Sequence, residues 1–115
     1  MLKAILIDDE QDALDTLEMD LKRYCAEEVK VISKCKSPID GMIAIRRLKP
    51  NLVFLDIQMP ELSGFEMLEI LKEIDFNLVF ITAHDDYAVK AFKVSAVDYL
   101  LKPVEEEELV QAVQK

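Results

Sequence analysis

Apolar residues gather in short runs that alternate with segments of helical periodicity. Four runs are strongly apolar and finish in polar or charged residues: residues 3–8, 51–56, 77–82 and 97–102. Continuous apolar runs of this length are typical of strands buried on both faces, as in a parallel sheet. A weaker run, Val29 to Ile32, carries Lys30 and is followed by Lys34. These lysines indicate an edge strand, because charge there discourages unwanted pairing.

Each run is followed by a segment whose apolar residues recur at helical spacing, and the first of these helices should span about four turns. Ser37 and Pro38 form a helix start signal. Asp85 and Asp86 are candidate caps of the fourth helix, and Glu105 to Glu108 suit a helix N-terminus. The apolar positions are Leu14, Leu17, Leu21 and Tyr24; Ile39, Met42, Ile43, Ile45 and Leu48; Phe65, Leu68, Leu71 and Ile74; Tyr87, Ala88, Ala91 and Phe92; and Leu109, Val110 and Val113.

Five strand–helix units in succession predict an α/β fold of the doubly wound, flavodoxin-like kind. We expect a five-stranded parallel sheet of order 2-1-3-4-5, with helices on both faces. Residues 51–56 (NLVFLD) and 77–82 (NLVFIT) are nearly identical. We interpret them as two neighbouring buried strands and not as a repeat, since their flanks differ. Residues 1–115 are expected to form one domain.

Composition narrows the possible partners. The net charge is -9, so the domain itself should repel a phosphate backbone and attract a divalent cation or a basic protein face. No stretch is long enough to span a membrane. Cys25 and Cys35 have no metal-ligand spacing and are expected to be small apolar filler, with a redox role as the alternative. The sequence indicates a cytoplasmic, soluble protein.

The polar ends of the four strong runs are the candidate site. They are Asp8 and Asp9, Asp56, Thr82, and Lys102. In a parallel sheet these ends lie on one rim, outside which ligands bind. Taken singly, Asp8 or Thr82 could be an ordinary cap and Asp56 the start of a turn, but together the five residues favour a functional site.

The charges of these residues point to a metal ion and a phosphoryl group. Three acids and one lysine sum to -2, which one Mg²⁺ would neutralise, and all-oxygen ligation suits Mg²⁺ or Mn²⁺. A phosphoryl group on Asp56 would remove its carboxylate charge and add about -1.5 to -2. Lys102 and the cation could stabilise that charge, and Thr82 could donate a hydrogen bond.

These residues and their flanks resemble a response-regulator receiver domain of two-component systems over the whole chain. The motifs that carry the resemblance are Ile7-Asp8-Asp9-Glu10, Asp56-Ile57-Gln58-Met59-Pro60 with Gly64, Thr82-Ala83, and Lys102-Pro103. Each motif alone is weak, but their order and spacing together are specific. The resemblance implies a phosphorylation-driven switch and not an enzyme, although such a domain catalyses its own phosphotransfer and slow self-dephosphorylation.

The resemblance also implies roles for single residues. It makes Asp56 the phosphoacceptor, and it implies a cis peptide bond between Lys102 and Pro103. The implied metal ligands are Asp8, mainly through water, Asp9, Asp56 and the backbone carbonyl of Gln58. The implied phosphate-pairing cation is Lys102, and the implied switch residues are Thr82 and Tyr99.

Residues 80–92 and 96–103 are similar to the LytTR-type branch, whose members usually carry a C-terminal DNA-binding domain. The chain stops at Gln114-Lys115 without a helix stop signal, so we expect a piece of a longer regulator from which the output domain is missing. The implied partners are a sensor histidine kinase and a second copy, in a phosphorylation-favoured homodimer through the fourth helix, fifth strand and fifth helix. DNA would be bound only through the missing domain.

Other interpretations stay open at this point. Haloacid-dehalogenase hydrolases also use an Asp nucleophile with Mg²⁺, but they need a second Asp where this chain has Gln58. An FMN-binding flavodoxin would need a phosphate-cradling loop where Asp8, Asp9 and Glu10 stand. Tyr99 could be a plain core aromatic. His84 is either an idle surface histidine or, like the Gln58 side chain, an influence on water access to the phosphoryl group.

Overall fold

The computed structural model describes residues 1–84 and 88–115, and its strands form a single parallel sheet. The strands are β1 (Leu2–Ile7), β2 (Val29–Cys35), β3 (Leu52–Leu55), β4 (Asn77–Thr82) and β5 (Asp98–Leu101). The helices are α1 (Gln11–Tyr24), α2 (Pro38–Leu48), α3 (Gly64–Leu71), α4 (Ala88–Lys93) and α5 (Glu106–Gln114). The strand order is β2-β1-β3-β4-β5 with every pair parallel, so the predicted fold and order are confirmed.

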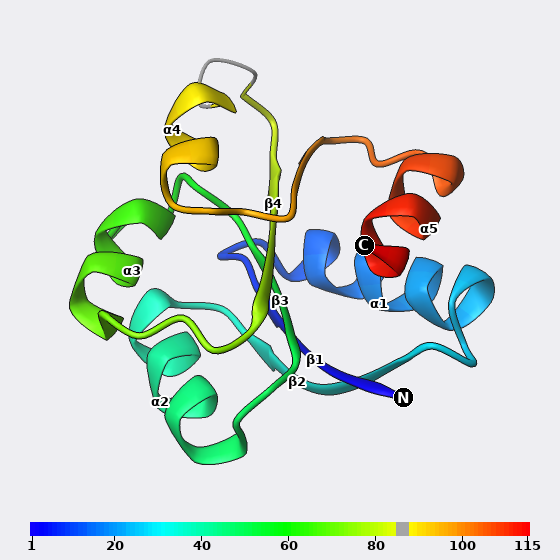
Figure 1. The fold of residues 1–115 in the computed structure, drawn as a ribbon, viewed down its shortest axis with the longest axis horizontal. Helices are drawn as coiled ribbons and strands as arrows, with labels where there is room; N and C mark the ends of the chain where they lie inside the picture. Colours follow the sequence, from blue (N-terminus) through cyan, green and yellow to red (C-terminus); the bar gives the residue numbers. More distant parts are fainter. Residues whose placement is uncertain (85–87) are drawn as a thin grey trace.

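Helices cover both faces of the sheet, with α1 and α5 on one face and α2, α3 and α4 on the other (Figure 1). Alternation along the strands divides the core accordingly. In β3, Val53 and Leu55 belong to the cluster under α2 and α3, whereas Leu52 and Phe54 belong to the cluster under α1 and α5. All four are almost fully buried. Burial on both faces explains why this strand is a continuous apolar run.

Serine caps begin two of the helices. The Ser37 hydroxyl accepts a hydrogen bond from the backbone N–H of Asp40 at 3.1 Å, with Pro38 in the first helical turn as predicted. Ser63 forms a capping box with Glu66: each side chain accepts a hydrogen bond from the other residue's backbone N–H. Such caps typically contribute about 1 kcal/mol each.

The third helix is shorter than predicted. It ends at Leu71, because Lys72 adopts a positive φ of 66° and turns the chain back toward β4. Ile74 therefore lies outside the helix, and the prediction that it belongs there is wrong. Its side chain still packs against the core on the α2 and α3 face, which is why the apolar spacing continued past the end of the helix.

The fourth helix is present as predicted, with the backbone helical from Ala88 to Lys93. The proposed caps Asp85 and Asp86, and Tyr87 in the predicted apolar stripe, lie outside the described residues.

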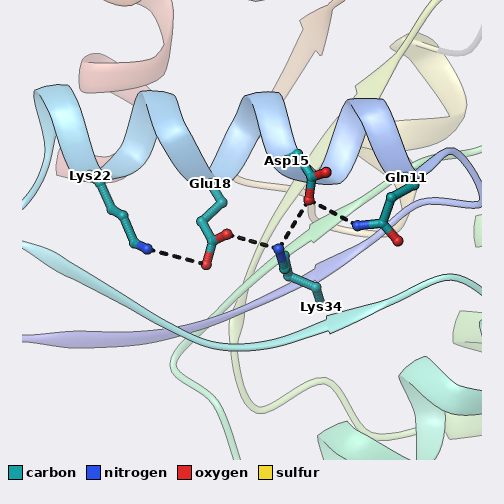
Figure 2. A network of polar contacts seen from close by, with 5 residues as sticks. All are labelled: Gln11, Asp15, Glu18, Lys22 and Lys34. Atoms are coloured by element: carbon teal, nitrogen blue, oxygen red, sulfur yellow. Dashed lines mark hydrogen bonds and ion pairs between the residues drawn. The ribbon is translucent and has the colours of Figure 1, made fainter.

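A polar network joins the edge strand β2 to α1 (Figure 2). The Lys34 ammonium lies 3.1 Å from Asp15 and 2.8 Å from Glu18, and Glu18 also pairs with Lys22 at 3.6 Å. The hydrogen bonds to Glu18 and Asp15 raise the pKa of Lys34, and the bond from Lys34 lowers the pKa of Glu18. Lys34 therefore ties a helix to the sheet in addition to placing charge near an edge.

The two cysteines are buried in different layers of the molecule. Cys25 belongs to the core under α1 and α5, and Cys35 to the core under α2 and α3. Both are free thiols, and burial raises the pKa of each. Among residues 1–84 and 88–115, no helix has the length and apolar character needed to cross a membrane.

Candidate functional site

The predicted site residues gather at the rim formed by the carboxyl ends of β1, β3, β4 and β5. Backbone hydrogen bonds continue one residue past the strands: Asp56 donates to Ile7 at 3.0 Å, and Lys102 donates to Thr82 at 2.8 Å. These bonds hold the residues that follow β3 and β5 in register with their neighbours. The side chains of Asp8, Asp56 and Thr82 are the buried polar ones in the described part of the chain.

Lys102 bridges two buried carboxylates at this rim. Its Nζ atom lies 2.7 Å from Oδ2 of Asp8 and 3.3 Å from Oδ2 of Asp56. The peptide bond between Lys102 and Pro103 is cis, as the family resemblance implies. The three strand ends that supply this triad are far apart in sequence, so the sheet is what brings them together.

One lysine does not neutralise both acids. Burial raises the pKa of Asp56 to about 6, and the neighbouring Asp8 charge adds to the rise, although Lys102 and the backbone N–H of Gln58 oppose it. Burial alone would lower the pKa of Lys102, but its hydrogen bond to Asp8 and the charges of Asp56 and Asp8 raise it. The rim therefore holds an excess of negative charge that favours a bound cation.

A cluster of acids next to Asp56 fits a hard divalent cation. Carboxylate oxygens of Asp8, Asp9 and Glu10 lie within 4.8 Å of one another, and the backbone N–H of Glu10 donates to Oδ1 of Asp8 at 3.0 Å. Oxygen-only donors of this kind suit Mg²⁺ or Mn²⁺. Glu10 was not predicted as a ligand, although it continues the acidic run. Asp56 lies outside this cluster and is linked to it through Lys102.

The loop after β3 lies beside the acids. Asp9 and Gln58 line one hollow of about 460 Å³ together with Glu61 and Glu66. Gly64 closes the loop, because its backbone N–H donates to the Ile57 carbonyl at 2.7 Å. A Cβ atom at Gly64 would lie only 2.8 Å from the backbone oxygen of Asp56. A glycine is therefore required there for the loop to pack against the backbone of Asp56.

The two predicted switch residues contact the same stretch of backbone. Thr82 is fully buried, and its Oγ1 accepts a hydrogen bond from the His84 backbone N–H at 3.3 Å. The Tyr99 hydroxyl donates to the His84 carbonyl, and its ring packs edge-on against Phe80 with the centroids 6.5 Å apart. His84 therefore links Thr82 to Tyr99 through its backbone, a connection that the sequence pattern did not indicate.

A cavity of about 260 Å³ lies beside the triad, between α1 and the segment after β5. Asp8, Asp56 and Lys102 line one part of it, and apolar side chains such as Leu17 and Val104 line another. Asp56 thus borders this cavity on the side of α1.

Fold and site together define a doubly wound parallel α/β domain with a lysine-bridged acidic rim. The chain belongs to the response regulator receiver domain family, whose model matches residues 4–114. It is the receiver domain of a two-component response regulator, and the predicted family is confirmed.

Individual relatives agree with this assignment. The chain is 47% identical to an uncharacterized response regulatory protein of Vibrio cholerae and 43% identical to the sensory transduction protein LytT of Bacillus anthracis, in each case over its full length. It is 41% identical, over 95% of its length, to the transcriptional regulatory protein BtsR of Escherichia coli. The chain spans about half the length of these relatives (48%, 47% and 45%).

Solved structures show the same fold. The response regulatory domain of mrkE from Klebsiella pneumoniae superposes with a TM-score of 0.86 at 29% identity, covering 98% of this chain and 93% of that domain. The similarity to LytT agrees with the predicted LytTR-type branch.

Proposed function

We propose that Asp56 accepts a phosphoryl group from a phosphohistidine of a sensor histidine kinase, in a Mg²⁺-dependent reaction that switches the domain. The observation that carries the proposal is the Lys102 ammonium, which lies within 3.3 Å of the Asp56 carboxylate and 2.7 Å of the Asp8 carboxylate. This arrangement places a fixed positive charge where phosphoryl oxygens would gather. Positioning and charge neutralisation are most of what phosphoryl transfer requires.

In the proposed step a carboxylate oxygen of Asp56 forms a bond to phosphorus while the bond from phosphorus to the histidine nitrogen breaks. The electron pair of that bond stays on the histidine nitrogen. Asp56 must be ionised to attack, so the opposing effects of burial and Lys102 on its pKa bear directly on its reactivity. The product carries a charge of about -1.5 to -2 on its phosphoryl oxygens, and Lys102 is placed to pair with one of them.

Asp8, Asp9, Asp56 and the backbone carbonyl of Gln58 would hold the Mg²⁺ ion, with Mn²⁺ as a substitute. The acidic cluster around Asp8 and Asp9 supports this ligand set, since it supplies the oxygen donors that Mg²⁺ prefers. When bound, the ion supplies positive charge to the oxygens of the transferring group.

The switch would run through Thr82 and Tyr99. The Thr82 hydroxyl would donate to a phosphoryl oxygen on Asp56, and this would alter its bond with the His84 backbone. Because Tyr99 also binds His84, a shift of this backbone would move the aromatic side chain. The surface of α4, β5 and α5 would then favour a homodimer, which is a population shift biased by a local charge.

In the whole regulator the dimer would control an output domain, and through it transcription. Relatives named as transcriptional regulatory proteins support this part of the proposal. Any DNA contact would be made by that output domain and not by the receiver, and the regulator would act in the cytoplasm.

Mass spectrometry tests the acceptor. Incubation with a small acyl phosphate and Mg²⁺ should add one phosphoryl group to the wild type and none to Asp56→Asn. Thr82→Ala should be labelled at Asp56 but should fail to form more dimer on labelling. Full labelling of Asp56→Asn would refute the assignment, and steady turnover of an added phosphomonoester would favour the hydrolase alternative.

A further inference from the structure

Positive charge is concentrated in one β–α unit of an otherwise acidic protein. Residues 30–49 contain a single acid, Asp40, and six basic residues, namely Lys30, Lys34, Lys36, Arg46, Arg47 and Lys49. The net charge of the whole chain is -9. A local excess of opposite sign produces a surface field that selects partners by charge. This basic unit comprises β2 and α2, on the edge of the sheet opposite β5.

Most of this charge is not used within the domain. The ammonium of Lys34 is bound by Asp15 and Glu18 of α1 (Figure 2). The other five basic residues of the unit form no ion pair with any residue in the described ranges, and all five are exposed. Internal stability does not explain why they are clustered.

A groove of about 560 Å³ runs between the end of β2 and α2. Its charged lining consists of three basic residues and one acid, Lys34, Lys36, Arg47 and Asp40, and Ile43 and Leu48 line it with apolar surface. Because Lys34 is bound by acids of α1, Lys36 and Arg47 supply the positive charge that is left for a partner. Ile43 is 50% exposed and Leu48 is 41% exposed, while Ile39, one helical turn earlier, is 48% exposed. This surface combines large apolar side chains with unpaired basic ones. A wholly polar ligand would leave the apolar side chains exposed to water.

The irregular edge strand and the spacing of apolar residues on α2 favour a helix over a strand as the occupant of the groove. The register of β1 and β2 shifts between Ala4 and Ile5, and irregularities of this kind discourage a further strand from adding at an edge. Ile39 and Ile43 are spaced four residues apart on α2, the spacing at which a second helix can pack its own apolar side chains. The net charge of -9 disfavours nucleic acid as the partner, since the rest of the surface would repel it.

We propose that this β2–α2 groove binds an acidic amphipathic helix of a partner protein. Carboxylates of the partner would pair with Lys36 and Arg47, and its apolar face would cover Ile43 and Leu48. The interaction lies apart from the phosphorylation chemistry, because it uses neither Asp56 nor the other residues at the rim.

Nuclear magnetic resonance of the labelled domain tests the groove. The probe is a helical peptide with glutamates on one face and leucines four residues apart on the other. It should shift amide signals of residues 33–36 and 43–48, and added salt should weaken it. Arg47→Glu should weaken binding about three- to tenfold, because an attraction at an exposed site becomes a repulsion.

Lys93→Glu is the matched control, since Lys93 is also an exposed basic residue in the last turn of a helix. It should change the affinity by less than about twofold. Ile43→Ser should weaken the leucine-bearing peptide but not a polyglutamate of equal length. If Arg47→Glu reduces thermal stability, Arg47→Gln should still give an intermediate loss.

Several results would contradict the proposed helix-binding groove. Shifts confined to other elements, or equal binding of the peptide by wild type and Arg47→Glu, would overturn the proposal. Equal affinity for polyglutamate would show a simple charge effect and no helix groove. Tighter binding of a DNA duplex of matched charge would identify a nucleic-acid surface instead.

Discussion

Asp56 bears its charge in surroundings that only partly compensate for it. Burial and the charge of Asp8 raise its pKa to about 6 from a value of 3.8. A carboxyl group whose pKa is higher in the folded than in the unfolded protein reduces the free energy of unfolding at any pH where the group is ionised in both. The loss is complete above about pH 6 and disappears as the pH falls toward 4.

Asp56→Asn should therefore stabilise the metal-free domain. At pH 7.5 in EDTA, the free energy of unfolding should rise by about 1–3 kcal/mol. The gain should shrink on acidification to pH 4, because wild-type Asp56 then takes up a proton. Urea unfolding at several pH values measures both effects. A gain that grows toward low pH would contradict the assigned cause.

Lys102 offsets the repulsion between Asp8 and Asp56, so its removal should have the opposite effect. Lys102→Met keeps the length of the side chain but leaves two buried carboxylates without their cation. In metal-free solution at pH 7.5 it should lower the free energy of unfolding by about 1–3 kcal/mol, and less below pH 6. The exposed Lys93→Met should change it by less than about 0.5 kcal/mol. Equal losses for both variants would show that the rim charges do not interact.

At the scale of elements, close backbone approach positions the acids, and two glycines allow a comparison. A Cβ at Gly64 would meet the backbone oxygen of Asp56 at 2.8 Å, whereas a Cβ at Gly41 of α2 would meet the terminal methyl of Ile7 at 2.6 Å. A side-chain methyl can move aside more easily than a backbone carbonyl. In the interior of a helix, alanine is also more stabilising than glycine by about 0.5–1 kcal/mol.

Gly64→Ala should thus cost about 1–3 kcal/mol of stability, and Gly41→Ala clearly less. Gly64→Ala should also slow phosphorylation of Asp56, because the loop behind the carboxylate is displaced. Urea unfolding and the rate of labelling by an acyl phosphate test the two statements. Greater damage from Gly41→Ala would mean that the packing of α2 on β1, and not the β3 loop, controls the position of the acids.

The order of the elements was predictable from the sequence because several boundaries carry a local chemical cause. Ser37 caps α2 through its own hydroxyl, and Asp56 had to lie where a buried strand leaves the core. The end of α3 was not predictable, because Lys72 reverses the chain by a backbone conformation that lysine rarely adopts. The binding of Lys34 to α1 was also missed, since a long side chain can reach either way from an edge strand.

The candidate site was also predictable from the sequence only in part. Parallel strands must end on one rim, so the gathering of Asp8, Asp56 and Lys102 could be inferred from three separate runs. The distances between these side chains could not be inferred. The Lys102 ammonium lies closer to the Asp8 carboxylate than to the Asp56 carboxylate. The shared contact of Thr82 and Tyr99 with the His84 backbone depends on loop geometry that residue types alone do not encode.

At the scale of the molecule, binding of Mg²⁺ should stabilise the fold by mass action. At a concentration ten times its dissociation constant, a ligand adds about 1.4 kcal/mol to the free energy of unfolding. Mg²⁺ should therefore raise Tm by several degrees relative to EDTA at equal ionic strength. Asp9→Asn should lose this gain, and Glu27→Gln, an exposed acid far from the rim, should keep it. An equal rise in both variants would indicate general screening of the net charge and no specific site.

The two buried cysteines have a consequence for how the domain opens. Cys25 lies in the layer on one face of the sheet and Cys35 in the layer on the other, and each thiol is shielded until its own layer loosens. The reactivity of each cysteine therefore reports local opening of the core on its own face of the sheet. The rate at which a thiol reagent modifies each cysteine would show whether phosphorylation tightens both layers together or only the one beneath α2, α3 and α4.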